Sequence, residues 1–276
     1  MLLELHLLFK AIHGSKKSRG VFNHKRFILA LKATNALFDN DEHHDSHEFA
    51  NWLLDTVHEN YLKNEAKKAA QTGRQITNNT WSFISELFQG KLQNTVTCVT
   101  CEKQTDREEN FFNLSIDIER NTSLIYCIKR FSVKELLNRD NKLYCERCLS
   151  KQVAIKEIQV SRFPKLLLVH LKRFKIDPNT YQQSKLSYRI PYADELRLEA
   201  KGKAYVYKLK GVVVHQGQGL AFGHYYAVVR SHGKWVKFDD THVSIISESE
   251  AQTYFGEPPI ARRTGWPCAY MLLYES

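Results

Sequence analysis

The sequence predicts an α+β fold, in which helices come first and strands follow. Apolar residues in the first 70 positions recur at helical spacing, whereas short runs rich in aromatic and β-branched residues follow one another after position 80. Hydrophobic residues make up 43% and charged residues 25% of the 276, which is the balance of a globular protein and not of a disordered chain. This length suits one large domain or two modest ones.

Helices are expected throughout residues 1–70. The first should be amphipathic, because its apolar residues share one helical face; they are Leu5, Leu8, Phe9 and Ile12. Glu4 and His6 interrupt this apolar run, and no basic segment precedes it, so it does not have the pattern of a signal peptide. A similar spacing predicts a second helix, with the apolar residues Phe22, Phe27, Ile28, Leu31 and Leu37.

A third helix should begin near Asp45 and Ser46, because either side chain can accept a hydrogen bond from a free backbone N–H group. Its buried face is expected to be a stripe of residues four apart, namely Phe49, Leu53, Val57 and Tyr61. Basic residues between Lys63 and Lys68 suit the negative end of a helix dipole, so the helix is expected to close there.

The polar segment 71–80, QTGRQITNNT, predicts a linker between two regions. Strands are expected after it, in the runs KLQNTVTC, FFNLSIDI, KLLLVHLKRFK, YVYKLKGVVVH, HYYAVVR and CAYMLLYE. Residues Ser132 to Leu137 predict one short helix among them.

The formal charge is +10, and most of this excess is local. Between Arg162 and Lys210 there are 12 basic and 4 acidic residues, a difference of +8. A nucleic-acid footprint would combine such a patch with a readout element, so the simpler interpretation is a solvated protein face. No run approaches the ~18 uninterrupted apolar residues of a membrane span, and we expect an intracellular protein, cytoplasmic or nuclear, with no membrane partner.

Six cysteines occupy positions 98, 101, 127, 145, 148 and 268. Cys98 and Cys101 form one CxxC pair, and Cys145 and Cys148 form a second after 43 intervening residues. Two such pairs supply the four thiolates of a closed tetrahedral zinc site, whose role is structural because no coordination position stays open. The alternative is four unrelated buried thiols, since a reducing compartment disfavours disulfides.

Two histidine-containing segments leave alternatives open. His224 precedes a run typical of a strand, and Asp239 and Asp240 follow the next one, which is an order suited to a base and an orienting carboxylate in a cysteine hydrolase. Taken alone, this spacing is a weak signal, and a structural histidine is the preferred interpretation of His224. The segment His43-His44-Asp45-Ser46-His47-Glu48 permits a metal site, but the HExxH order is absent and the start of a helix is the preferred interpretation.

Together these residues resemble the ubiquitin-specific protease family (peptidase C19, ubiquitin carboxyl-terminal hydrolases), most closely its subgroup activated by WD40-repeat partners. The landmarks run in family order over nearly the whole chain; besides the two CxxC pairs they are DSHEFANWLLD, FQGKL, LSIDI, LKRF, GHY, FDD and the closing YMLLY. The resemblance implies a papain-like hand with a helical thumb, a β-rich palm and zinc-bound fingers. Residues 1–70 would be the remainder of the thumb, residues 81–160 mainly fingers and residues 161–276 mainly palm.

The resemblance also implies roles for single residues. His224 matches the general base, Asp239 the residue that orients it, and Asp240 an adjacent acid that can assist. The zinc ligands of the fingers match Cys98, Cys101, Cys145 and Cys148. Ubiquitin or ubiquitinated proteins are the implied partners, with a WD40-repeat activator besides. The basic run LKRFK becomes a palm strand, which needs no nucleic acid to explain it.

One departure from the family pattern bears on activity. The nucleophile of the family lies in a box Gly-Asn-Thr-Cys-Tyr-x-Asn-Ser, which does not occur in these 276 residues. The N-terminal part of the thumb is thus expected to be absent, and apolar surface should be exposed on both thumb and palm. Cys127 and Cys268 are not expected in the cleft, and the family's Gln-Gln-Asp box reads His43-His44-Asp45.

Three functions follow as hypotheses. The first is a thiol-dependent deubiquitinase that cleaves isopeptide bonds after the C-terminal glycine of ubiquitin, inactive as written because the thiolate is missing. The sequence would then be an incomplete product of a longer gene or a degenerate homologue. The second is a non-catalytic pseudo-deubiquitinase that binds ubiquitin or a partner. The third, least favoured, is a zinc-ribbon protein that binds nucleic acid through residues 162–210.

Overall fold

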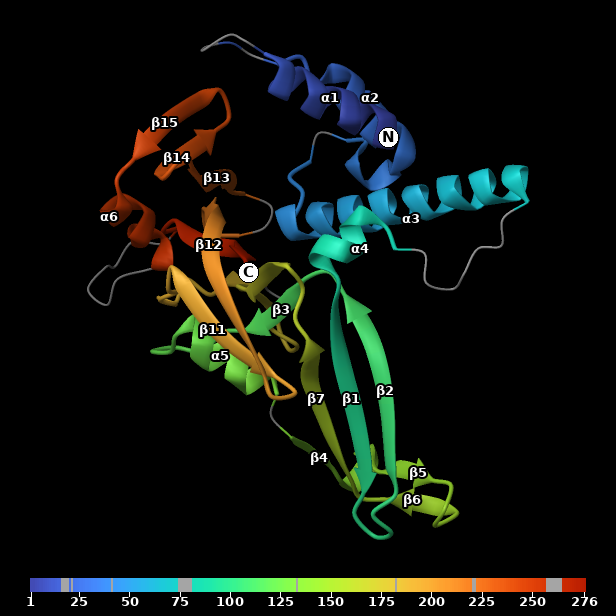
Figure 1. Cartoon of the computed structure of the whole chain (residues 1–276). Helices are drawn as coiled ribbons and strands as arrows, with labels where there is room; N and C mark the ends of the chain where they lie inside the picture. Colours follow the sequence, from blue (N-terminus) through green and yellow to red (C-terminus); the bar gives the residue numbers. More distant parts are fainter. Residues whose placement is uncertain are drawn as a thin grey trace.

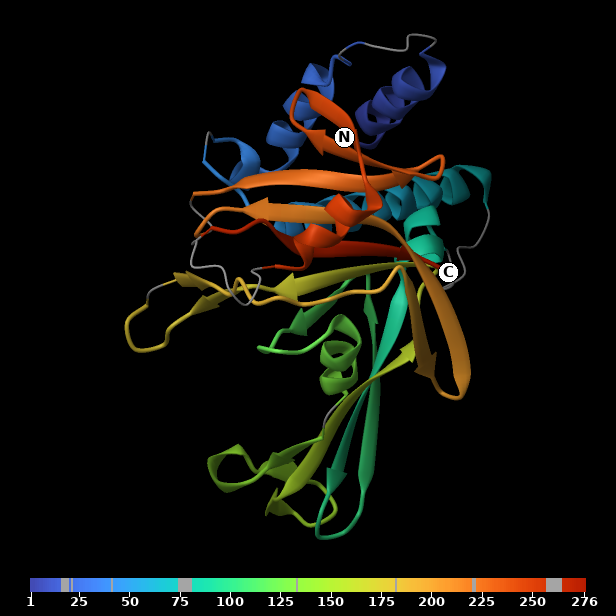
Figure 2. The ribbon, with the colours of Figure 1, turned by 90° about the vertical axis from the view of Figure 1, so that its left-hand side faces the viewer.

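The computed structural model describes most of the chain, namely residues 1–15, 20, 22–40, 42–73, 81–132, 134–181, 183–219, 222–256 and 265–276. Three parts are arranged one above another (Figure 1): a layer of helices, a large sheet and a long narrow sheet. Figure 2 shows the large sheet between the other two parts. We call them thumb, palm and fingers. No helix among the described residues is long and apolar enough to cross a membrane.

The thumb contains the three helices expected from the sequence and one more. Its elements are α1 (Leu2–Gly14), α2 (Lys25–Thr34), the 3-10 turn η1 (Ala36–Phe38), α3 (Ser46–Thr72) and α4 (Phe83–Phe88). The Asp45 side chain caps α3 by accepting a hydrogen bond from the N–H of His47 at 2.7 Å, so the predicted helix start is confirmed.

Two helices differ in their bounds from the expectation. The second helix is shorter at both ends. It begins at Lys25, after Phe22, and Asn35 ends it in an extended conformation with its side chain capping η1 instead, which leaves Leu37 outside. The third is longer and ends at Gly73, whose φ of 64° suits glycine. It therefore continues into the predicted linker 71–80, of which residues 74–80 lie outside the described residues.

The fingers are a four-stranded antiparallel sheet in the order β2-β1-β7-β4. The bounds are β1 Gly90–Cys98, β2 Gln104–Phe111, β4 Glu135–Leu137 and β7 Ala154–Arg162. A small hairpin of β5 (Leu143–Cys145) and β6 (Ser150–Gln152) extends the far end. The short helix predicted over Ser132–Leu137 is wrong, since Glu135 to Leu137 pair with β7 as an edge strand.

The palm is an eight-stranded sheet in which seven strands follow the order β15-β14-β13-β12-β16-β8-β3 and β11 pairs with the free half of β12. The bounds are β3 Leu114–Asp117, β8 Leu166–Lys172, β11 Glu195–Ala200, β12 Lys203–Gln216, β13 His224–Ser231, β14 Lys234–Asp239, β15 His242–Ile246 and β16 Cys268–Glu275. The strand runs predicted from the sequence are thus largely observed. All pairs are antiparallel except β3 with β8.

The main hydrophobic core lies within the palm and under its short helices. These are α5 (Leu124–Phe131), α6 (Glu248–Ala251) and the 3-10 turn η3 (Gln252–Phe255), and a hairpin of β9 (Phe174–Ile176) and β10 (Gln183–Lys185) leaves the sheet edge. Leu167, Val214 and Leu272 are completely buried there. This rigid sheet ends at one side in the β13 and β14 termini, where the candidate base and carboxylate lie.

Candidate functional site

His224 and Asp239 come together where two neighbouring palm strands end and begin. His224 is the first residue of β13 and Asp239 the last residue of the antiparallel strand β14, so the two strand ends meet. The Nε2 atom of His224 lies 2.5 Å from Oδ1 of Asp239. Since the carboxylate occupies Nε2, the nitrogen left to accept a proton from another group is Nδ1. The pair has the geometry of a general base held by an orienting carboxylate.

The second carboxylate oxygen of Asp239 also has a partner. The ammonium group of Lys237, two residues earlier on the same face of β14, lies 2.8 Å from Oδ2. Hydrogen bonds from Lys237 and then from His224 hold the pKa of Asp239 below its ordinary value, so the carboxylate is ionised at neutral pH.

Asp240 lies beside the pair in an unusual backbone conformation. Its φ is 51°, in the left-handed region, at the start of the turn from β14 to β15. One donor atom from each of His224, Asp239 and Asp240 lies within 4.8 Å of the others. Because Lys237 already pairs with Asp239, the net negative charge that this group offers to a cation is reduced.

A buried histidine lies beneath the start of β13. His215 on β12 has no exposed surface, and its ring packs edge-on against Tyr225 at 4.8 Å. Burial, followed by the charge of Lys185, lowers the pKa of His215 to about 4, so the ring stays neutral. A Cβ atom added to Gly223 would overlap Nε2 of His215. The backbone before His224 therefore lies directly on this ring, which requires glycine at 223.

The N-terminus of α3 is fastened to the palm by polar contacts. The Tyr270 hydroxyl on β16 donates to Oδ2 of Asp45 at 2.5 Å. The rings of His47 and His170 stack with centroids 3.7 Å apart, and Ser115 lies 3.0 Å from Nδ1 of His170. Burial lowers the pKa of His170 to about 3, which keeps its ring neutral against His47.

The histidines at the start of this segment do not form a metal site. His44 lies 2.7 Å from the side chain of Asn40, and its ring contacts Phe38 edge-on. Among the described residues, the groups of three or more close His, Cys, Asp or Glu side chains do not include His43, His44 or His47. The segment therefore starts a helix, as preferred from the sequence, and the structure shows in addition that it contacts the palm.

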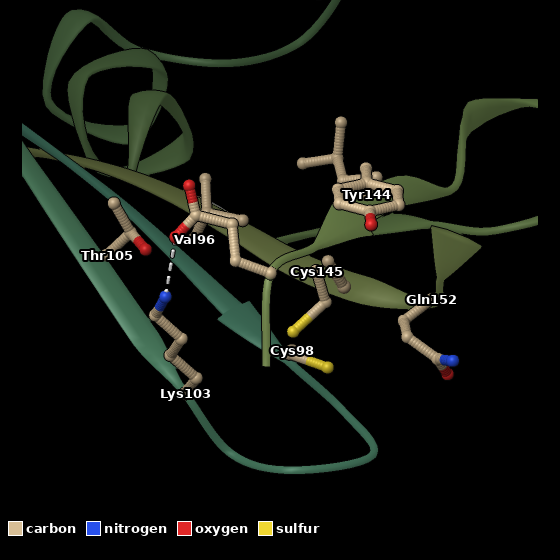
Figure 3. A pocket seen from close by; sticks show the side chains of 10 residues that line it. Val96, Cys98, Lys103, Thr105, Tyr144, Cys145 and Gln152 are labelled. Carbon is tan, nitrogen blue, oxygen red and sulfur yellow. Dashed lines mark hydrogen bonds and ion pairs between the residues drawn. The ribbon is translucent and has the colours of Figure 1, made fainter. Parts of the chain in front are cut away.

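The four cysteines of the two CxxC pairs converge at the far end of the fingers. Cys98 ends β1 and Cys145 ends β5, and each pair continues into a turn that carries the second cysteine, Cys101 or Cys148. All four sulfur atoms lie within 4.8 Å of one another, and those of Cys101 and Cys145 are 3.6 Å apart. Figure 3 shows the sulfur atoms of Cys98 and Cys145 turned toward the same space.

This donor set fits a zinc ion. A tetrahedral ion with Zn–S bonds of about 2.3 Å places its sulfur atoms about 3.8 Å apart, which is close to the observed spacing. The backbone N–H of Cys148 is the largest of several contacts that lower the pKa of Cys145 to about 7. Lys103 pairs with Glu146 at 2.9 Å and so links the two turns (Figure 3). The four residues can therefore hold a structural ion.

The remaining two cysteines lie elsewhere in the interior. Cys127 on α5 is 2% exposed, with its sulfur 3.3 Å from the Thr122 hydroxyl. Cys268, the first residue of β16, is completely buried, and its sulfur lies 3.8 Å from the backbone oxygen of His215. Neither thiol reaches the surface on which His224 is exposed.

With fold and site described, the class of protein is clear: the chain belongs to the ubiquitin carboxyl-terminal hydrolase family, whose pattern matches residues 1–274. Ubiquitin carboxyl-terminal hydrolase 4 of Arabidopsis thaliana is 39% identical over 292 residues, covering 98% of this chain and 79% of its own length. Ubiquitin carboxyl-terminal hydrolase 12 of Salmo salar is 38% identical over 289 residues, covering 98% and 76%.

Solved structures show the same fold. A SAGA DUB module of Ubp8, Sgf11, Sus1 and Sgf73 bound to monoubiquitin matches with a TM-score of 0.72 and 26% identity, over 90% of this chain and 52% of the other. A yeast SAGA DUB module with an Sgf73 mutant matches with a TM-score of 0.76 and 26% identity, over 99% and 57%. The chain spans little more than half the length of these structures. The predicted family and the α+β, papain-like hand are confirmed.

Two features of the site were not predicted from the sequence, namely Lys237 and the contact between Tyr270 and Asp45. Lys237 carried a signal, because residues two apart in a strand share a face and a lysine two positions before an aspartate can reach it. The contact between Tyr270 and Asp45 joins residues 225 positions apart and had no local signal.

Proposed function

We propose that this chain carries the base and the orienting carboxylate of a thiol-dependent deubiquitinase, without its nucleophile. The observation that supports this most directly is the His224–Asp239 pair at 2.5 Å, with Nδ1 left for proton transfer. In the full reaction a thiolate would attack the isopeptide carbonyl after the last glycine of ubiquitin. His224 would take the thiol proton at Nδ1 and return it to the leaving lysine amine, and Asp239 would hold the imidazole.

We propose that the 276 residues alone do not cleave ubiquitin conjugates. Four cysteines lie together in the fingers, and the other two, Cys127 and Cys268, are buried. Removal of one member of such a catalytic unit costs several powers of ten in rate, because the residues act together.

Exposed apolar surface on and beside the strand that carries Asp239 supports this proposal. Phe238, Val243 and Ile245 are 45%, 60% and 66% exposed on β14 and β15. Their cross-strand pairing places them on the same palm face as Tyr225, whose ring packs against Tyr270, the residue that donates to Asp45 at the start of α3. On the thumb, Leu3 and Phe9 line an apolar cavity of about 670 Å³ between α1, α3 and α4. Apolar faces of this kind suit a further packed element.

Ubiquitin is the proposed partner, and zinc the proposed ion of the four cysteines. Two solved relatives hold monoubiquitin and ubiquitin aldehyde, which supports the same partner for this family member. A WD40-repeat activator and a cytoplasmic or nuclear location remain proposals that follow from the subgroup resemblance.

The second candidate is a non-catalytic pseudo-deubiquitinase that binds ubiquitin or a partner. The coding sequence upstream of codon 1 discriminates between the two. An open reading frame that encodes Gly-Asn-Thr-Cys before Met1 supports the deubiquitinase. An in-frame stop, or an intact frame without this box, refutes it and leaves the pseudo-deubiquitinase.

A further inference from the structure

The Lys237 side chain is held in place by two contacts, one of them with the carboxylate of Asp239. Its ammonium group lies 2.8 Å from Oδ2 of Asp239 and 4.2 Å from the centre of the Tyr226 ring. The side chain is only 24% exposed, so these contacts are shielded from much of the solvent. Lys237 is therefore a partner of the site and not a freely solvated surface lysine.

The carboxylate of Asp239 is shared between two partners, His224 and Lys237. Oδ1 faces Nε2 of His224 at 2.5 Å, and Oδ2 faces Lys237. A permanent positive charge on Oδ2 offsets part of the negative charge that would otherwise stabilise a protonated imidazole. The ion pair also restrains rotation of the carboxylate, which holds Oδ1 toward His224.

The other ionisable groups around Lys237 come from the short helices packed on this palm face. Tyr254 of η3 and Glu250 of α6 act on it electrostatically, and the hydrogen bond that Lys237 donates to Asp239 is the largest effect that raises the pKa of the lysine. Burial raises the pKa of Tyr226 and of Tyr254, so both rings are neutral near pH 7. Lys237 thus stays charged at neutral pH.

We propose that Lys237 is a positioning residue that shares the Asp239 carboxylate with His224, holds Oδ1 toward Nε2 and weakens the attraction of that carboxylate for a protonated imidazole. This role rests on the proposed function of His224 as a general base. Without the lysine, the undivided carboxylate would favour the imidazolium, a form that cannot take a proton from a thiol.

The test is the titration of His224 by NMR in the full chain labelled at its histidines, from about pH 5 to about pH 9. The signal is assigned by its loss in His224→Gln. In Lys237→Met we expect the midpoint of His224 to rise by about half a pH unit or more, since one neighbouring charge is removed. Lys237→Arg retains the charge and should restore the midpoint to within about 0.2 unit of the original.

Controls separate this effect from a general disturbance. Lys234→Met removes an exposed lysine at the other end of β14 and should leave the midpoint unchanged. Asp239→Asn should lower it, which shows that the signal responds to the carboxylate. An unchanged or lowered midpoint in Lys237→Met, with the other histidine signals in place, overturns the proposal. Because no ubiquitin is involved, this result is independent of whether the chain binds or cleaves ubiquitin.

Discussion

The Nε2 atom of His224 lies 2.5 Å from Oδ1 of Asp239, across the ends of two adjacent antiparallel strands. This contact fixes which imidazole nitrogen is available for chemistry, because Nδ1 is the one left free of the carboxylate. The palm core holds the two strand ends in position, and the backbone before His224 packs against the buried ring of His215.

Gly223→Ala should disturb the site through this ring. The added methyl group would overlap Nε2 of His215 and approach the backbone oxygen of Gln216, so the backbone before His224 must shift. Such overpacking typically costs about 1–3 kcal/mol. Urea unfolding and the NMR signal of His224 should both change. Gly219→Ala is the matched control, since a Cβ there meets nothing within 4 Å; equal effects of the two substitutions would refute this account.

Zinc should be bound at about one ion per chain and should order the fingers. Cys98→Ser and Cys145→Ser each remove one of four thiolates, and we expect loss of the ion and of the thermal stability that it provides. Metal analysis and thermal unfolding with and without a chelator measure this. Cys127→Ser, in the palm core, should retain the ion. Zinc content that is the same in Cys145→Ser and in the unsubstituted chain would contradict the assignment.

Stability should fall between about pH 6.5 and pH 4 because of buried histidines. Burial lowers the pKa of His170 to about 3 and that of His215 to about 4, whereas both are ordinary, near 6.5, in the unfolded chain. Below pH 6.5 the unfolded state therefore binds protons that the folded state does not. Each histidine then costs about 1.4 kcal/mol of unfolding free energy per pH unit until its folded pKa is reached.

Urea unfolding at several pH values measures this slope. Because lowered carboxylate pKa values such as that of Asp239 add to the acid loss, the decisive quantity is a difference between variants. His170→Gln should reduce the slope between pH 6 and pH 5 by about 1.4 kcal/mol per unit. His13→Gln, at an exposed position on α1, should leave it unchanged. A slope unaffected by His170→Gln would show that this ring is protonated in the folded state.

Tyr270→Phe should loosen the thumb from the palm. The tyrosine donates to a carboxylate, and hydrogen bonds to charged groups contribute about 1.5–3 kcal/mol. Tyr274→Phe removes a hydrogen bond to the backbone oxygen of Ala193 on the same strand, which should cost about 1 kcal/mol. Urea unfolding of both variants tests whether Tyr270→Phe is the more destabilising, and the reverse order would contradict a thumb contact of this strength.

The sequence correctly predicted those helices and strands that are encoded by residues close together in the chain. The Asp45 cap and the alternating palm strands depend on residues close together in the chain, so spacing was enough. It did not predict α5, whose buried residues Leu124, Cys127 and Ile128 make a stripe over only eight positions, although Ser123 marks its start. The strand Glu135–Leu137 was taken for a helix because its only strand partner, β7, lies some twenty residues away.

The residues of the site also fall into two groups, those identified by local motifs and those identified only by the structure. The candidate residues His224, Asp239 and the four cysteines were named from motifs, and the fold brings each group together. The contact of Tyr270 with Asp45 depends on the packing of a thumb helix on the last palm strand, which no local pattern encodes. The sequence alone did not predict contacts between residues that are far apart in the chain and meet only through tertiary packing.

The central proposal is that these 276 residues bind ubiquitin and do not cleave its conjugates. Its most direct test is a titration of the zinc-loaded chain with ubiquitin, together with incubation of the same preparation with a fluorogenic C-terminal ubiquitin amide. We expect saturable binding, and a rate of fluorophore release equal to that of the His224→Ala variant. Release that exceeds the His224→Ala rate would contradict the missing nucleophile, and absence of binding would contradict ubiquitin recognition.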